Sequence, residues 1–127
     1  MTPDTSFSWE SRLVVPSLLY PGVEFVIAKM TFGRRLELMR GVRDLAARLE
    51  FFEAGRDARN EMEASLLSAE IDKLYLRWAL IEVRGLELDA APATVDALIE
   101  IGPEEIFKEA LAAVKASCGL SEAERKN

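Results

Sequence analysis

The chain contains no histidine and a single cysteine among its 127 residues. These absences exclude a Ser-His-Asp triad, a Cys-His pair and a histidine-containing zinc site. The cysteine count also excludes a cysteine-only zinc site and an intrachain disulfide. GxGxxG, Walker A, HExxH and EF-hand patterns are absent as well. The sequence therefore predicts no catalytic site, no metal site and no cofactor.

Long apolar runs are missing too. The most apolar stretch, residues 64–83, is broken by Glu70, Asp72, Lys73 and Arg77, whereas a membrane span needs about 18 apolar residues with few or no charges. The N-terminus, MTPDTSFSWE, has neither the basic nor the apolar region of a signal peptide. We therefore expect no membrane contact and a cytoplasmic location, with which the lone cysteine agrees.

Positive charge is scarce and unevenly placed. The chain has 16 basic and 22 acidic residues, which gives a net charge of -6. A nucleic-acid partner is not expected, because phosphate binding needs a basic face. Five arginines nevertheless gather in one segment: Arg34, Arg35, Arg40, Arg43 and Arg48. Acidic residues alternate with them, so the pattern is typical of a solvated helix face, with Arg34 and Arg35 as the candidates for contact with an acidic partner.

Half of the residues are hydrophobic, which is enough to bury a core in one domain over residues 1–127. We expect a mainly α (α+β) fold. Residues 1–8 read as a flexible start, 9–30 as a β-hairpin or arm, 31–119 as a helical body and 120–127 as a frayed tail.

The expected hairpin has strands at residues 12–15 and 23–27 around Tyr20-Pro21-Gly22. Proline presets φ and glycine accepts a positive φ, which favours a turn at this place. An isolated two-stranded hairpin is marginally stable in water. The hairpin must therefore pack on the helices or pair with another chain.

Two long antiparallel helices are expected over residues 34–54 and 58–84. Thr31 and Asp57 are the expected N-caps, and Gly55 and Gly85 the expected stops. Each helix carries an apolar stripe with spacings of three and four residues: Leu38, Val42, Leu45, Leu49 and Phe52 on the first, and Leu67, Ile71, Leu74, Trp78 and Ile81 on the second.

The rest of the chain predicts a shorter helical pair. Residues 86–89 read as extended and 90–93 as a loop, before helices over 94–100 and 103–119. Residues 121–124 fit a capping box for a last turn.

Apolar positions outside the stripes are candidates for partner contact. Phe51 and Phe52 are adjacent, so one of them lies off the stripe, and Tyr75 and Leu76 widen the apolar surface of the second helix. Glu70 and Asp72 point in different directions on a helix, so ion pairing with Lys73 is the better interpretation than catalysis. The partner-binding candidates are Tyr20, Phe25, Arg34, Arg35, Phe51, Tyr75 and Leu76.

Four segments together resemble the small tail assembly chaperones of bacteriophages and prophages. They are residues 20–25 (YPGVEF), 31–38 (TFGRRLEL), 70–78 (EIDKLYLRW) and 119–122 (GLSE). The resemblance implies a non-enzymatic protein that binds the tail tape measure and tail tube proteins during assembly. None of these segments is a defined catalytic or ligand site in that family.

Two other classes remain open. One is a virion structural or head–tail connector component that self-associates, and the other is a small helical bacterial adaptor. Weak self-association is compatible with the chaperone hypothesis as well, since a β-arm can add a strand to another subunit.

Overall fold

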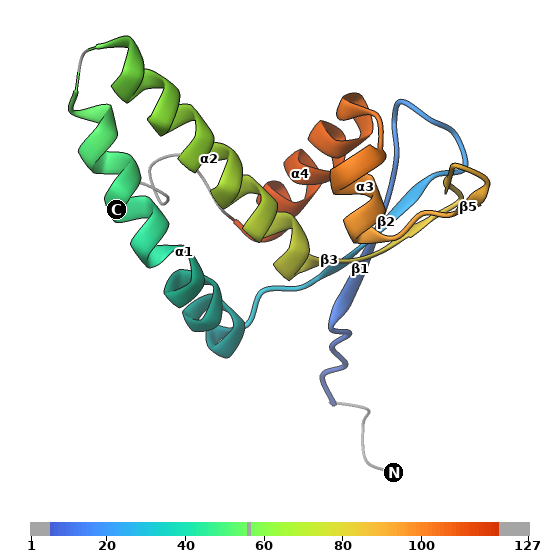
Figure 1. Cartoon of the computed structure of the whole chain (residues 1–127). Coiled ribbons are helices and arrows are strands. Elements are labelled where there is room, and N and C mark those ends of the chain that lie inside the picture. The colour runs from blue at the N-terminus through green and yellow to red at the C-terminus, as the bar shows by residue number, and fades with distance from the viewer. Residues whose placement is uncertain (1–5, 56, 120–127) are drawn as a thin grey trace.

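The computed structural model of the chain describes residues 6–55 and 57–119. Its elements, in order, are β1 (Arg12–Pro16), β2 (Glu24–Ala28), α1 (Phe32–Glu53), α2 (Ala58–Ala79), β3 (Leu80–Arg84), β4 (Glu87–Leu88), β5 (Ala91–Pro92), α3 (Val95–Ile101) and α4 (Glu104–Ser117). A three-stranded sheet with α3 and α4 forms one end of the molecule, and the α1–α2 pair projects from it as an arm (Figure 1). The expected mainly α fold with an N-terminal β-hairpin, two long antiparallel helices and a shorter helical pair is confirmed.

The sheet is antiparallel and has the order β1-β2-β3. The pairs Leu13–Ile27 and Val15–Phe25 join β1 to β2, which confirms the predicted hairpin. On the other side of β2, Phe25 pairs with Val83 and Ile27 pairs with Leu80. The hairpin is thus extended by a third strand from the middle of the chain.

That third strand corrects the expected length of the second helix. The sequence predicts helix through residue 84, but α2 ends at Ala79 and β3 follows without a loop. Leu80 and Val83 both face the core although they are three residues apart, a helical spacing. A β-bulge explains this, because the register shifts and Ile81 is the extra residue between the two pairs. The bulge therefore gives a strand the apolar spacing of a helix.

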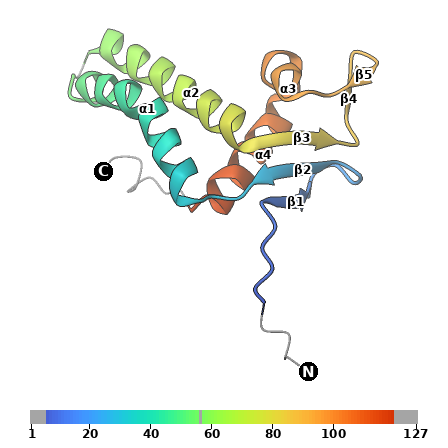
Figure 2. The ribbon, with the colours of Figure 1, turned by 90° about the horizontal axis from the view of Figure 1, so that it is seen from below.

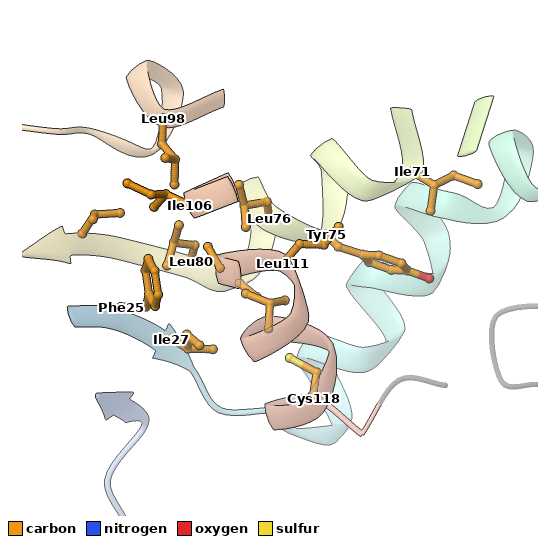
Figure 3. Packing of buried hydrophobic residues seen from close by; sticks show 14 of the residues in the cluster. Phe25, Ile27, Ile71, Tyr75, Leu76, Leu80, Leu98, Ile106, Leu111 and Cys118 are labelled. Carbon is orange, nitrogen blue, oxygen red and sulfur yellow. The ribbon is translucent and has the colours of Figure 1, made fainter. Parts of the chain in front are cut away.

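The core lies between the sheet and the helices that cover its inner face. Phe25 and Ile27 of β2 meet Leu80 of β3, while α4 and the end of α2 close the other side (Figure 3). Ile27 and Leu76 are both 0% exposed. The hydrophobic cluster is thus assembled from segments that are far apart in sequence.

The α1–α2 arm has the N-caps that the sequence predicts, and it has the predicted apolar stripes apart from Ile81, which lies on β3. Thr31 Oγ1 accepts a hydrogen bond from the N–H of Arg34 at 3.1 Å, and Asp57 Oδ1 accepts one from the N–H of Asn60 at 2.8 Å. These contacts satisfy otherwise unpaired donors at the two helix starts. The stripe residues that are fully buried are Leu38 and Leu49 on α1 and Leu67 and Ile71 on α2.

The C-terminal helical pair is also as expected in its main features. Thr94 caps α3 by accepting a hydrogen bond from the N–H of Ala97, and Gly119, with φ of +68°, follows α4. Between the sheet and α3, β4 and β5 form a small hairpin where the sequence predicts only an extended piece and a loop. The predicted features at residues 1–5 and 120–127 lie outside the described residues.

On the outer face of the sheet there is no helix among residues 6–55 and 57–119. Viewed from below, the three strands lie in front of α4 with no helix in front of them (Figure 2). Val14 on this face is 43% exposed, whereas its neighbour Val26 is 1% exposed. One face of the sheet therefore builds the hydrophobic cluster, whereas the other is exposed at Val14 and buried at Val26.

Candidate functional site

Exposed apolar side chains gather in three places in the described part of the chain. The first is β1 and the loop after it, the second is the start of α1, and the third is the distal part of the arm. The residues are Leu13, Val14, Leu18, Leu19 and Tyr20 in the first place, Phe32, Leu36 and Met39 in the second, and Phe51, Met62 and Leu66 in the third. In the first, a side chain from a distant helix binds the backbone of the loop.

The loop of residues 17–22 joins β1 to β2 through a tight turn. The N–H of Val23 donates to the carbonyl of Tyr20 at 3.1 Å, with Pro21 and Gly22 between them. Gly22 has φ of +91°, so proline first and glycine second make this a type II turn. The N–H of Ser17 donates to the carbonyl of Val23 at 2.8 Å and closes the loop at its base.

Glu109 of α4 binds the backbone of this loop. Its Oε1 accepts a hydrogen bond from the Ser17 hydroxyl at 2.6 Å, and its Oε2 accepts from the N–H groups of Leu18 and Leu19 at 2.7 and 3.3 Å. The Ser17 hydroxyl oxygen in turn accepts from the N–H of Tyr20 at 3.0 Å. One carboxylate thus fixes a loop whose residues are about ninety positions away in sequence.

These contacts set the protonation of Glu109. Partial burial by itself raises the pKa of this carboxyl, but the hydrogen bonds from Ser17, Leu18 and Leu19 outweigh it and hold the pKa below its ordinary value. The carboxylate is therefore ionised at neutral pH, where its hydrogen bonds to the loop are charge-assisted.

A second contact with α4 lies one helical turn before Glu109. The Tyr20 hydroxyl donates to Oε2 of Glu105 at 2.9 Å. This hydrogen bond, together with the negative charge of Glu105, raises the pKa of the Tyr20 hydroxyl. Tyr20, a predicted partner-binding residue, is 36% exposed, so it both anchors the loop and contributes to its surface.

The turn after β3 supports the loop from the other side. Gly85 has φ of +76°, and a Cβ placed on it would collide with the carbonyl oxygen of Gly22. Only glycine allows the two backbones to approach this closely. With its backbone held by α4 and by Gly85, the loop displays Leu18, which is 91% exposed, and Leu19, which is 57% exposed.

The outer edge of β1 adjoins the loop. The carbonyl of Ser11 accepts from the N–H of Lys29, and the N–H of Ser17 donates to Val23. Hydrogen-bonded pairs alternate along an antiparallel ladder, so Leu13 and Val15 also direct their backbone groups toward β2. In the described residues, Arg12, Val14 and Pro16 direct theirs away from the sheet, at an edge that no other strand covers.

Arg34 and Arg35 are engaged within the chain. The guanidinium of Arg34 lies 4.3 Å from the centre of the Trp78 ring and donates to the Trp78 carbonyl, and Arg35 donates to the carbonyl of Cys118. Both carbonyls are at the C-terminal ends of helices, where cations are favourable. This placement corrects the prediction of an arginine pair directed at an acidic partner.

Three predicted contact residues are core residues. Phe25, Tyr75 and Leu76 are 1%, 3% and 0% exposed, so the prediction of a partner surface at these positions is wrong. The end of α2 is apolar on two sides because α1 covers one side while α4 and the sheet cover another (Figure 3). Phe51, in contrast, is 72% exposed beside the half-buried Phe52, which confirms that one of the two lies off the stripe.

The charged residues of α2 take part in packing between helices. Asp72 Oδ1 lies 3.2 Å from Nζ of Lys115 on α4, whereas the sequence predicts pairing with Lys73.

Cys118 is buried, and burial raises the pKa of its thiol despite the opposing charges of Arg35 and Arg34. Residues 6–55 and 57–119 contain no group of three or more potential metal-ligating side chains. No helix in this part of the chain is long and apolar enough to cross a membrane.

Comparisons of the chain with protein-family models, with curated proteins and with solved structures give no match. The function proposed below therefore rests on the geometry of the 17–22 loop and on the resemblance of four sequence segments. Among the predicted site residues, Tyr20 alone belongs to this loop. The sequence signals its turn through Pro21 and Gly22, but nothing in it signals the contact with Glu109.

Proposed function

We propose that the chain is a non-enzymatic protein-binding protein and that its binding surface is the 17–22 loop. The observation that carries this proposal is the fixed backbone of an apolar loop, with Leu18 91% exposed above hydrogen bonds to Glu109. Burying such a side chain against a partner contributes about 2 kcal/mol. Because the loop is already ordered, little conformational entropy is lost when it binds.

The specific form of the proposal is an assembly chaperone for phage or prophage tail proteins, acting in the host cytoplasm. The resemblance of segments 20–25, 31–38, 70–78 and 119–122 supports it, and the first of these segments overlaps the loop. The clients are then the tape measure and tail tube proteins. The net charge of -6 supports such a role, since it favours solubility of a complex with an apolar client.

Co-expression with the neighbouring open reading frames tests the proposal, with pull-down and size-exclusion chromatography as readouts. We expect capture and solubilisation of a long, helix-rich, apolar neighbour. The variant Leu18→Ser/Leu19→Ser should lose capture. Its control is Leu66→Ser on the arm, because Leu66 and Leu19 are both 57% exposed, and this variant should retain capture.

Two results would overturn the proposal. If the parent protein captures no neighbour and forms a stable ring alone, the self-associating structural component is the better hypothesis. If both leucine variants capture the client equally, the loop is not the binding surface. Phage neighbours missing from the gene's surroundings would favour the bacterial adaptor.

A further inference from the structure

We propose that β1 pairs antiparallel with β1 of a second copy, centred on Val14, to form a two-fold dimer. This inference goes beyond the proposed function and does not depend on it. In Figure 2, β1 lies at the outer edge of the sheet, and no helix or strand of the described segments lies beside it. A second copy at this edge would make one continuous sheet from the two molecules.

The backbone groups at this edge are self-complementary. Val14 directs both its N–H and its carbonyl outward, so two Val14 residues related by a two-fold axis can exchange both hydrogen bonds. In the same register, the N–H of Arg12 meets the carbonyl of Pro16 in the other copy. Proline has no N–H to return, so the carbonyl of Arg12 is left to water. Every other outward N–H and carbonyl group of these three residues forms a hydrogen bond between the two copies.

The apolar side chains on the outer face continue across the same axis. Val14 pairs with Val26 on this face, and Val14 is 43% exposed in one copy. Placing two Val14 side chains together makes a row that runs from Val26 of one copy to Val26 of the other. Cross-strand pairs of β-branched residues stabilise sheets in this way.

The charges of Arg12 and Glu24 favour this register and a second copy as the partner. Arg12 and Glu24 are on the same outer face, because they share the parity of Val14 and Val26. No ion pair involves either residue within the described part of the chain. In the dimer, Arg12 lies in one row with Pro16 and Glu24 of the other copy. Two strand spacings, about 10 Å between Cα atoms, separate Arg12 from that Glu24, and a long arginine side chain can bridge this gap over the proline.

A two-fold arrangement also limits association at this edge to two copies. The contact is isologous, so both copies use the same strand and the assembly closes at two. Pro16 ends the pairing at the side of the loop, since it cannot donate to a ladder. A foreign strand would find the same backbone groups, but only a second copy supplies the Glu24 that matches Arg12 twice.

Sedimentation equilibrium of the full chain over a wide concentration range tests the dimer. We expect a reversible monomer–dimer equilibrium with a dissociation constant in the micromolar to submillimolar range, because edge pairing buries a small area. The variant Val14→Pro removes only an outward N–H and should remain monomeric. Its control is Leu13→Thr, which keeps all ladder donors and should still dimerise. Circular dichroism checks that both variants fold.

Charge reversal gives a test that does not depend on proline. Arg12→Glu puts two acidic residues opposite each other at both ends of the dimer, and Glu24→Arg puts two basic residues there. Each variant alone should dimerise about tenfold more weakly. An equimolar mixture should form a heterodimer at least as tight as the parent, because both contacts then join opposite charges.

The control for net charge is Arg40→Glu, on an exposed position of α1, which should dimerise like the parent. A parent protein that stays monomeric up to about 1 mM overturns the proposal and leaves the edge to another occupant. A dimer that is unaffected by Val14→Pro, or two charge variants that fail to pair when mixed, would also overturn it.

Discussion

The two ends of the molecule are built by different kinds of contact. In the arm, α1 and α2 follow each other in sequence and form one helical hairpin (Figure 1). They pack against each other through their apolar stripes. At the sheet end, β2 meets α4 across about eighty residues, and Glu109 binds residues 17–19 across about ninety. The arm is a local structure, whereas the sheet end exists only when the whole chain has folded.

The side chains at the sheet end are also more deeply buried than those along the arm. Ile27 and Leu98 at the sheet end, and Leu76 where α2 meets the sheet, are 0% exposed. Farther along the arm, Leu49, Leu67 and Ile71 are buried, but Val42, Leu45 and Phe52 are only partly buried. Small local units with few buried side chains open more readily than the core. The candidate binding loop is thus attached to the more stable end, where a fixed geometry can be maintained.

Truncating a core leucine at each end should give the largest difference in stability. Leu76→Ala leaves a cavity between α2, α4 and the sheet, and we expect a loss of about 3 kcal/mol in the free energy of unfolding. Leu45→Ala on the arm removes a half-buried side chain and should cost about 1 kcal/mol. Urea unfolding followed by circular dichroism measures both. Equal losses would contradict the difference between the two ends.

The same glycine-to-alanine change should have opposite signs at the two ends. Gly85→Ala forces a Cβ against the Gly22 carbonyl at a positive φ and should cost about 2 kcal/mol. Gly33 lies in the first turn of α1 with nothing within 4 Å of a built Cβ. Gly33→Ala should therefore stabilise the protein by about 0.5 kcal/mol. Thermal unfolding of the two variants against the parent shows the sign directly.

The sequence predicts the arm well because its signals are local. Thr31 and Asp57 are recognisable N-caps, and stripes such as Leu38, Leu45 and Leu49 recur at helical spacing. The exception is residues 80–84, where the bulge at Ile81 gives Leu80 and Val83 the spacing of a helix. Periodicity alone cannot separate these two cases. Only the pairing of Val83 with Phe25 decides for a strand.

The site is predicted less well because its contacts are distant in sequence. Pro21 and Gly22 indicate the turn, and Tyr20 is named with it. Glu109, which holds the loop, is one of several glutamates on an amphipathic helix, and nothing in its surroundings distinguishes it. Tyr75 and Leu76 are predicted wrongly for a related reason. The sequence shows that they are apolar, but it does not show which elements of the chain cover them.

Removing a charged side chain should give the smallest difference in stability between the two ends, and this difference should depend on pH. Glu109→Gln removes a carboxylate that accepts hydrogen bonds from Ser17, Leu18 and Leu19, and we expect a loss of about 1 kcal/mol after allowing for solvent screening. Asp44→Asn on the arm is the matched control. Asp44 pairs only with Arg43 among the described residues, and both side chains are largely exposed, so this change should have little effect on stability.

The pH dependence distinguishes the loss of charge from a local distortion. The pKa of Glu109 is lower in the folded chain than its ordinary value. Its contribution to stability is therefore complete above that ordinary value and is lost as the pH falls below it and through the lowered pKa. Amide NMR signals of Leu18 and Leu19 should shift in this range in the parent and in Asp44→Asn, but not in Glu109→Gln. If these signals titrate in Glu109→Gln as in the parent, another carboxyl group holds the loop.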